Sequence, residues 1–196
     1  MKFDIIIIGA GISGMCVASA LQAAGRKTAV IGAGRSIHEV EVAPYERLGG
    51  TLLLGDSVTE GVFEGDRLRA VHTANLGTYP LEAEYFVIAT GKFLGCGLVA
   101  DMEGVYEPLF GLDVDYEADR SRWFDPHFEA PQPVLRFGVR TDGRLRPSIG
   151  GRTVENLFAC GELLAGISAT DGREGILESA RSVIGFIKEE TGHAEA

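Results

Sequence analysis

The chain is poor in basic side chains. Its 196 residues include 18 lysines and arginines against 28 aspartates and glutamates, so the formal net charge is -10 at neutral pH. Nucleic-acid binding requires a basic surface that meets the phosphates, and a polybasic membrane contact requires clustered positive charge. We therefore expect that this chain binds neither nucleic acid nor a membrane surface directly.

Cysteine is also scarce, and metal-ligand patterns are missing. Cys16, Cys96 and Cys160 lie far apart and form no Cys-x-x-Cys pair, and the four histidines show no ligand spacing. Zinc sites and iron-sulfur clusters need closely spaced ligands, and a disulfide framework needs an even number of cysteines. We predict no metal in this chain and a reducing, cytoplasmic location.

No apolar run is long and uninterrupted enough to indicate a membrane segment. The longest, residues 5–21, is interrupted at Gly9, Gly11, Ser13 and Gly14, and Lys2 alone supplies positive charge before it. A membrane-spanning helix needs about 20 mainly apolar residues, and a signal peptide begins with a basic segment. We expect neither direct membrane insertion nor a signal peptide.

Glycine, by contrast, is abundant, with 27 residues in the chain. The segment Gly9-Ala10-Gly11-Ile12-Ser13-Gly14 follows an apolar, β-rich run at residues 3–8 and precedes residues 15–25, which are rich in helix formers. A second buried strand is expected at residues 27–31. Strand, glycine turn, helix and strand within about 30 residues predict a βαβ unit with parallel strands.

The Gly-x-Gly-x-x-Gly spacing is typical of dinucleotide-binding proteins. Gly9 allows the tight turn, Gly11 lets the backbone approach a pyrophosphate, and Gly14 lets the helix pack closely on the strand. Free N–H groups at the start of the helix attract the phosphate charge. We therefore predict that Gly9, Gly11, Ile12, Ser13 and Gly14 bind the cofactor.

The acid that normally follows the second strand is missing. An Asp or Glu about 20 residues after the glycine motif holds the adenosine ribose. No acidic residue lies between Asp4 and Glu39. Two alternatives follow: either no adenosine half is bound, which favours FMN over FAD, or Arg35 and Ser36 receive a phosphate, as in NADP sites.

The remaining chain completes the predicted fold. Residues 51–85 alternate in polarity and carry hairpin signals at residues 64–66 and 75–77, which predicts an antiparallel β-meander. We expect an α/β fold in a single FAD/NAD(P)-binding domain, residues 1–196, with a Rossmann-like parallel sheet, the meander and a C-terminal helix. Further expected elements are buried strands at residues 86–90 and 157–160, a hairpin at residues 134–147, and the final helix at residues 173–188.

Two short segments favour a flavin over a nicotinamide cofactor. Ala89-Thr90-Gly91 ends the strand after the meander, and Gly161-Glu162 leads by a short loop into the final helix. With the glycine motif, and in this order, they resemble flavoproteins of the glutathione-reductase type. The resemblance implies that Ala89, Thr90 and Gly91 lie beside the dinucleotide. It also implies that Gly161 and Glu162 hold its ribityl or pyrophosphate region and that the next helix points its N-terminus at the flavin ring.

Three longer segments, residues 86–114, 124–147 and 155–166, resemble the B subunits of anaerobic glycerol-3-phosphate dehydrogenases. The resemblance implies a FAD cofactor, with FMN as the alternative, and oxidation of sn-glycerol 3-phosphate to dihydroxyacetone phosphate with electrons passed toward a quinone. It implies two partners, a larger flavoprotein dehydrogenase subunit and an iron-sulfur membrane-anchor subunit. The location implied is cytoplasmic, peripheral at the inner membrane through these partners.

Members of that family carry a large segment between the second strand and the meander, which is reduced here to residues 36–50. Residues 92–150 are then expected to be a reduced segment that faces substrate or partner. The shortening favours a second hypothesis, a non-catalytic flavin-carrying or assembly subunit. If Arg35 binds a phosphate, a third hypothesis follows, that the chain is an NADP-binding module.

A basic island lies at residues 134–153, with five arginines and one acid. Arg136 and Arg140 alternate with apolar residues, which predicts that they share one strand face. Together with Arg144 they are candidates for binding a phosphate of substrate or cofactor, or an acidic partner. The alternative is a solvated hairpin face whose arginines pair with nearby carboxylates.

Overall fold

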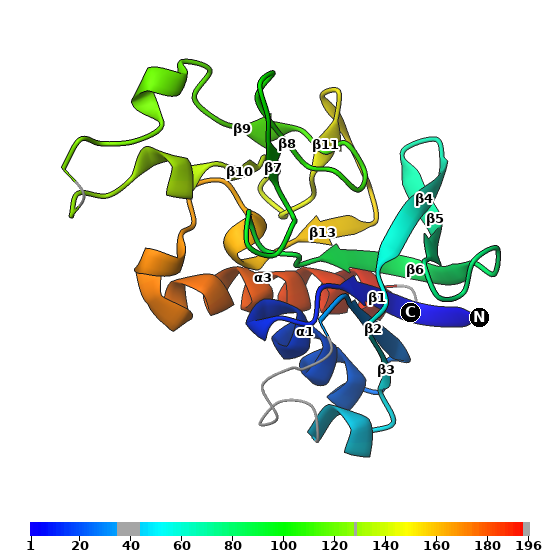
Figure 1. The fold of residues 1–196 in the computed structure, drawn as a ribbon. Helices are drawn as coiled ribbons and strands as arrows, with labels where there is room; N and C mark the ends of the chain where they lie inside the picture. Colours follow the sequence, from blue (N-terminus) through cyan, green and yellow to red (C-terminus); the bar gives the residue numbers. More distant parts are fainter. Residues whose placement is uncertain (35–43, 128, 194–196) are drawn as a thin grey trace.

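A computed structural model describes residues 1–34, 44–127 and 129–193. Within these residues the main sheet has seven strands in the order β3-β2-β1-β6-β5-β4, and β13 pairs with β6 on the same side as β5 (Figure 1). The strands are β1 (Lys2–Ile8), β2 (Thr28–Gly32), β3 (Thr51–Leu54), β4 (Val58–Glu64), β5 (Arg67–Thr73), β6 (Leu81–Ile88) and β13 (Leu157–Ala159). The predicted α/β fold with a Rossmann-like sheet is confirmed.

The parallel part of the sheet is buried on both faces. β1 pairs in parallel with β2 and with β6, and β6 pairs in parallel with β13. Ile6 and Ile8 of β1 belong to one hydrophobic core, whereas Ile5 and Ile7 belong to the core on the opposite face. A continuous apolar run is therefore needed, because successive side chains enter different cores.

Two helices cover one face of the sheet, and they contact each other (Figure 1). Helix α1 (Ile12–Ala23) connects β1 to β2, and α3 (Gly172–His193) follows the short 3-10 helix η4 (Ala169–Asp171). As predicted for the final helix, Ala180, Val183 and Ile187 are fully buried. No helix among the described residues is both long and apolar enough to span a bilayer.

The other face is covered by the segment between β6 and β13. It contains three two-stranded sheets and short 3-10 helices, which lie above the main sheet in Figure 1. Trp123 and Phe137 meet edge to face, with ring centroids 5.5 Å apart. The elements are β7 (Val99–Ala100), β8 (Val105–Tyr106), β9 (Val114–Asp115), β10 (Gly138–Val139), β11 (Ser148–Ile149), β12 (Arg152–Thr153), η1 (Arg120–Arg122) and η2 (Pro133–Arg136).

The antiparallel meander was predicted to start at residue 51, but in the structure it starts with β4 at Val58. β4 and β5 form the expected hairpin, and β5 pairs antiparallel with β6. β3, however, pairs in parallel with β2 and forms the edge of the Rossmann-like sheet. The sequence of residues 51–54 suits a strand paired with β2 as well as a strand of the meander. Tertiary contacts therefore decide which partner it pairs with.

The predicted hairpin at residues 134–147 is also largely wrong. Residues 133–136 form the 3-10 helix η2, and β10 pairs with β9 instead of with the following residues. A turn is present where it was expected. The N–H of Asp142 donates to the carbonyl of Arg146 at 2.9 Å, and Thr141 and Pro147 form an isolated antiparallel β-bridge. The Pro133 that opens η2 favours the first turn of a helix over a strand interior.

The side chain of Asn156 lies at the junction between β5 and β13, which pair one after the other with the same edge of β6. β5 pairs with the first half of β6 and β13 with the second half. The buried Asn156 amide donates to the carbonyls of Leu68 at 2.8 Å and Glu84 at 2.7 Å, and its oxygen accepts from the N–H of Leu68 at 2.9 Å. The meander and the parallel sheet are thereby joined by a fully satisfied polar contact.

Candidate functional site

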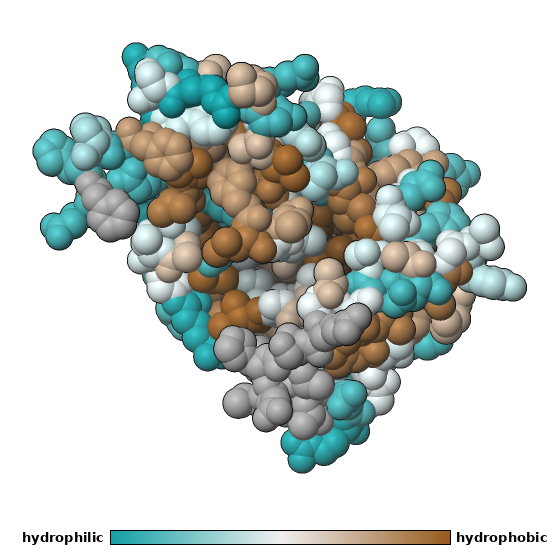
Figure 2. All heavy atoms as spheres, viewed as in Figure 1, coloured by the Kyte–Doolittle hydropathy of each residue, from teal (hydrophilic) through white to brown (hydrophobic). Residues whose placement is uncertain are grey.

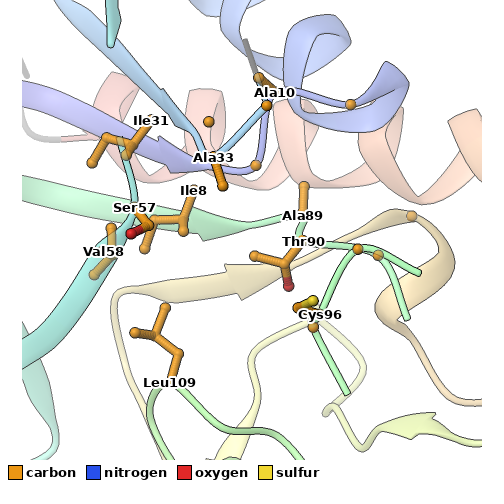
Figure 3. Close-up of a pocket in the computed structure, with 18 of the residues that line it drawn as sticks. Ile8, Ala10, Ile31, Ala33, Ser57, Val58, Ala89, Thr90, Cys96 and Leu109 are labelled. Atoms are coloured by element: carbon orange, nitrogen blue, oxygen red, sulfur yellow. The ribbon is translucent and has the colours of Figure 1, made fainter. Parts of the chain in front are cut away.

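A cleft of about 840 Å³ opens where the parallel strands end. In Figure 2 the surface is hollowed near the middle of the face shown, and hydrophobic side chains surround the hollow. Ala10 and Ala33 reach the cavity from the side of α1 and β2, and Cys96 and Leu109 from the opposite side (Figure 3). Ligands of open α/β folds bind at this carboxyl edge of the strands.

Five segments at the ends of main-sheet strands build the cleft, together with two from the covering segment. The glycine motif follows β1, residues 31–34 end β2, residues 56–59 lead from β3 to β4, and residues 89–91 follow β6. Gly161 and Glu162 follow β13, and Ile176 comes from α3. The site predicted from the three motifs is therefore assembled in one place. Gly95–Gly97 and Glu107–Leu109 also line it, and the sequence did not indicate them.

The three motif glycines have different surroundings, in agreement with their predicted roles. Gly9 has φ +114°, and a Cβ there would collide with the carbonyl of Ala89, directly after β6. A Cβ on Gly14 would collide with the carbonyl of Gly9, so the helix could not pack as closely. A Cβ on Gly11 meets nothing within 4 Å. Gly11 therefore has space beside it at the cleft wall, as an approaching ligand requires.

The start of α1 offers free backbone donors at the cleft. Gly11 is the N-cap residue and has no side chain to accept from the helix, and the first turn contains no acidic residue. The first helical hydrogen bond runs from the N–H of Met15 to the carbonyl of Gly11 at 2.9 Å. The N–H groups of Ile12, Ser13 and Gly14 precede it and have no helical partner, so they favour a bound anion.

Thr90 presents a hydroxyl that lacks a partner. Among the described residues, its Oγ1 is the one buried side-chain N or O atom without a hydrogen bond. The side chain lies on the cleft wall beside Cys96 (Figure 3). A buried hydroxyl without a partner is costly, which indicates that a bound molecule completes it. The uncapped helix start, the space at Gly11 and this hydroxyl together fit a dinucleotide.

The second predicted segment, Gly161-Glu162, is only partly free to bind. Gly161 has φ +78° and begins the 3-10 helix η3 (Gly161–Leu163). Its N–H donates to Oγ of Ser179 at 2.9 Å, so this backbone donor is used within the protein. The half-buried Glu162 lines the cleft. Glu162, and not the Gly161 N–H, is the group that remains for a ligand.

Two further carboxylates line the cleft, but they organise their own loops. Oδ1 of Asp56 accepts from the N–H groups of Ser57 at 2.9 Å and Asn75 at 3.0 Å. Glu107 accepts from the N–H groups of three residues of its own loop, Leu109, Phe110 and Leu112. Burial raises the pKa of Glu107, and these hydrogen bonds oppose the rise. Both acids fix loop backbone around the cavity.

The predicted arginine face does not form. Arg136 lies in η2 and makes a two-bond ion pair with Asp171, at 2.7 Å for each bond. Arg140 pairs with Asp115 at 2.5 Å. Arg144 pairs with Glu189 at 3.2 Å and stacks on the ring of Phe186. None of the three arginines is among the described residues that line the cleft. The structure therefore agrees with the alternative, in which the arginines pair with nearby carboxylates.

Arg35 and Ser36 were predicted to receive a phosphate of the cofactor. Both lie outside the described residues. The residues just before them, Gly32, Ala33 and Gly34, line the cleft at the end of β2. The role of Arg35 and Ser36 stays a prediction.

These features define a dinucleotide-binding domain whose cleft is built for an anionic cofactor. The family model for the FAD binding domain matches residues 43–176, more than half of the chain, and the chain belongs to this family. The match lies outside the glycine motif, so the motif and the family indicate the cofactor independently. FAD as the predicted cofactor is confirmed at the level of the family.

Among curated relatives, the chain is similar to the B subunit of anaerobic glycerol-3-phosphate dehydrogenase from Vibrio cholerae serotype O1 (strain M66-2). The two are 46% identical over 135 residues, which cover 68% of this chain and 31% of the relative. The corresponding protein of Yersinia enterocolitica is 39% identical over 133 residues, with the same coverage. The match therefore spans about a third of the length of these relatives.

Solved structures support the fold. A thioredoxin reductase from Gloeobacter violaceus superposes with a TM-score of 0.60 at 10% identity and covers 100% of this chain and 97% of that one. L-proline dehydrogenase from P. horikoshii gives a TM-score of 0.59 at 12% identity, covering 98% of this chain and 56% of that one. At these identities the likeness concerns the fold alone.

Replacing Glu162 is expected to weaken cofactor binding. Glu162→Ala removes the acceptor that we predict for a ribityl or ribose hydroxyl. An unpaired buried polar group costs about 1–3 kcal/mol, which corresponds to roughly ten- to hundredfold weaker binding. Fluorescence titration of the flavin-free protein measures the dissociation constant. Glu155→Ala is the control, because Glu155 pairs with Arg67 away from the cleft. A Glu162→Ala dissociation constant within twofold of wild type would rule out the contact.

Proposed function

We propose that this chain is the FAD-binding part of a flavin-dependent oxidoreductase that oxidises sn-glycerol 3-phosphate to dihydroxyacetone phosphate. The observation that carries the flavin-binding half of the proposal is the open, uncapped start of α1 at Gly11, which faces the cleft. The substrate rests on the similarity to the B subunits of glycerol-3-phosphate dehydrogenases over 68% of the chain. A bound flavin supplies a two-electron acceptor, which the oxidation of an alcohol to a ketone requires.

Different walls of the cleft would bind different parts of the cofactor. The N–H groups of Ile12 and Ser13 would hold the pyrophosphate, and Thr90 would donate to or accept from a cofactor oxygen. The walls at residues 31–34 and 56–59 extend the cavity past the phosphate site toward β3. This additional length supports FAD over FMN, because an adenosine half needs a place beyond the pyrophosphate.

The same proposal includes partners. We propose a larger flavoprotein dehydrogenase subunit and an iron-sulfur membrane-anchor subunit, with electrons passed through them toward a quinone. What supports partners in general is that the similar curated proteins are named as subunits. A cytoplasmic location, peripheral at the inner membrane through such partners, belongs to the proposal as well.

A non-catalytic flavin carrier is the second candidate, and the lining of the cleft favours it. Among the described lining residues, the titratable side chains are those of Asp56, Cys96, Glu107 and Glu162. Asp56 and Glu107 are engaged by backbone N–H groups. The described lining contains no histidine or lysine, so Glu162 and Cys96 are the side chains left to take a proton from a substrate hydroxyl.

The absorption spectrum of the purified protein tests the proposal. The two visible bands of oxidised flavin are expected, either as isolated or after incubation with FAD. Chromatography of the released cofactor then separates FAD from FMN. A protein that takes up neither flavin overturns the proposal, and tight binding of NADPH by such a protein would favour the NADP-binding module. Turnover with glycerol 3-phosphate, with and without partner subunits, separates the enzyme from the carrier.

A further inference from the structure

A buried lysine directly follows the Ala89-Thr90-Gly91 segment, and the proposed function assigns it no role. Lys92 is 8% exposed. Its Nζ donates to the carbonyl of Leu135 at 2.6 Å and to that of Ile167 at 2.5 Å. It therefore ties the turn after β6 to η2 and to the loop before α3. Gly91, the residue before it, lines the cleft.

The charge of Lys92 has no directly bonded counter-ion. No carboxylate of the described residues lies within 4.0 Å of its Nζ, and both hydrogen-bond partners are neutral carbonyls. The charged groups that face it are Glu162, Arg136 and Asp171. Asp171 is already paired with Arg136 through two bonds. Glu162, on the cleft wall, is thus the remaining negative group: the two cations and two carboxylates balance formally, but neither carboxylate is bonded to the Lys92 ammonium.

Burial of a lysine without an ion-pair partner is unfavourable. Desolvation, opposed by Glu162, lowers the pKa of Lys92 to about 8. The side chain is therefore mostly charged at neutral pH, and any negative charge that develops nearby in the cleft is stabilised by it. Ile167, whose carbonyl Lys92 binds, lies in the loop that follows Gly161-Glu162, and these two residues line the end of the cleft at which the resemblance places the flavin.

We propose that Lys92 is a positioning residue that holds the Gly161-Glu162 end of the cleft and, through its charge, favours reduced over oxidised flavin at this site. The inference rests on the proposed flavin-binding function. On reduction, oxidised flavin takes up two electrons and one proton and gains one negative charge. A cation behind the cleft wall stabilises this product more than the neutral starting form, so the bound flavin is easier to reduce.

The reduction potential of the bound flavin tests the inference. Wild type, Lys92→Met and Lys92→Arg are loaded with FAD and reduced with dithionite against a reference dye at pH 7. Lys188→Met is the control, because Lys188 is exposed on α3. For Lys92→Met we expect the ratio of reduced to oxidised flavin affinity to fall about tenfold, equivalent to about 30 mV for a two-electron couple. Lys92→Arg, which keeps the charge, and Lys188→Met should stay within twofold of wild type.

If Lys92→Met binds flavin with an unchanged potential, the inference about Lys92 is wrong while the flavin-binding function stands. If wild type itself takes up no flavin, both fail. A potential that falls equally in Lys92→Met and Lys92→Arg would show that geometry alone matters, and would overturn the electrostatic role.

The flavin-free protein gives a second readout. A lysine ionises with a pKa of about 10.4 in an unfolded chain, whereas burial lowers the pKa of Lys92 to about 8 in the fold. Between these values the unfolded state binds more protons, so the free energy of unfolding rises with pH. In urea titrations from pH 7 to 10, wild type should therefore gain stability relative to Lys92→Met. An equal pH dependence of the two proteins would show that Lys92 is not a buried cation.

Discussion

Gly11→Val is expected to abolish flavin binding and to leave the fold intact. The N-cap backbone at Gly11 has φ -77° and ψ -176°, which any residue adopts, and a Cβ there meets nothing within 4 Å. The added side chain is therefore tolerated by the protein but occupies the space that a pyrophosphate needs. The measurement is flavin content after reconstitution, with circular dichroism and the urea midpoint as checks of folding.

Two other glycines serve as controls for this result. Gly185→Val places the same side chain on the exposed surface of α3, where a Cβ also meets nothing within 4 Å, and should bind flavin like wild type. Gly14→Val should instead impair folding, because its Cβ would collide with the carbonyl of Gly9. Flavin content in Gly11→Val equal to that of Gly185→Val would refute the assignment of the phosphate site.

The isolated chain is expected to show little or no glycerol-3-phosphate:dye reductase activity, even when saturated with flavin. Substrate positioning and exclusion of water supply much of the rate in such reactions. The match spans 31% of the Vibrio cholerae relative, and the described cleft lining holds no free proton acceptor besides Glu162 and Cys96. Activity should therefore require a partner protein.

Steady-state assays with an artificial electron acceptor measure this directly. The control is the same preparation with partner subunits added, because recovered turnover would show that the flavin was competent. Turnover by the partner-free chain at an ordinary enzymatic rate, on the order of 10 per second, would contradict the prediction. Arg136 and Arg140 pair with Asp171 and Asp115 and do not share a strand face, and the prediction that they bind an acidic partner is tested in the same assay by charge reversal of each arginine.

The parallel core of the fold could be predicted because its signals are local. The apolar run at residues 3–8, the glycine motif and Gly25 at the end of the helix each specify their element through neighbouring residues. The space at Gly11 and the collision at Gly14 follow from the same motif. For this reason the sequence predicted which loops meet at this end of the cleft, whereas phosphate binding by their residues stays a prediction.

The covering segment could not be predicted, because long-range contacts decide its structure. β10 pairs with β9 across more than twenty residues, and Asp113 accepts from Ser148 at 2.7 Å and from the N–H groups of Gly150 and Gly151. Strands of two residues carry no periodic pattern. The cleft wall at Gly95–Gly97 and the burial of Lys92 depend on this segment and were missed for the same reason.

The Asn156 contact at β6 couples opening of the meander to opening of the parallel sheet. On the edge of β6 opposite β1, β5 pairs with the first half and β13 with the second half, and the Asn156 amide bonds to the backbone of Leu68 in β5 and of Glu84 in β6. Separating the meander would expose these buried polar groups together with the strand edge. The two parts should therefore exchange their amide hydrogens as one cooperative unit, and a loss of meander stability would be transmitted to the cofactor cleft.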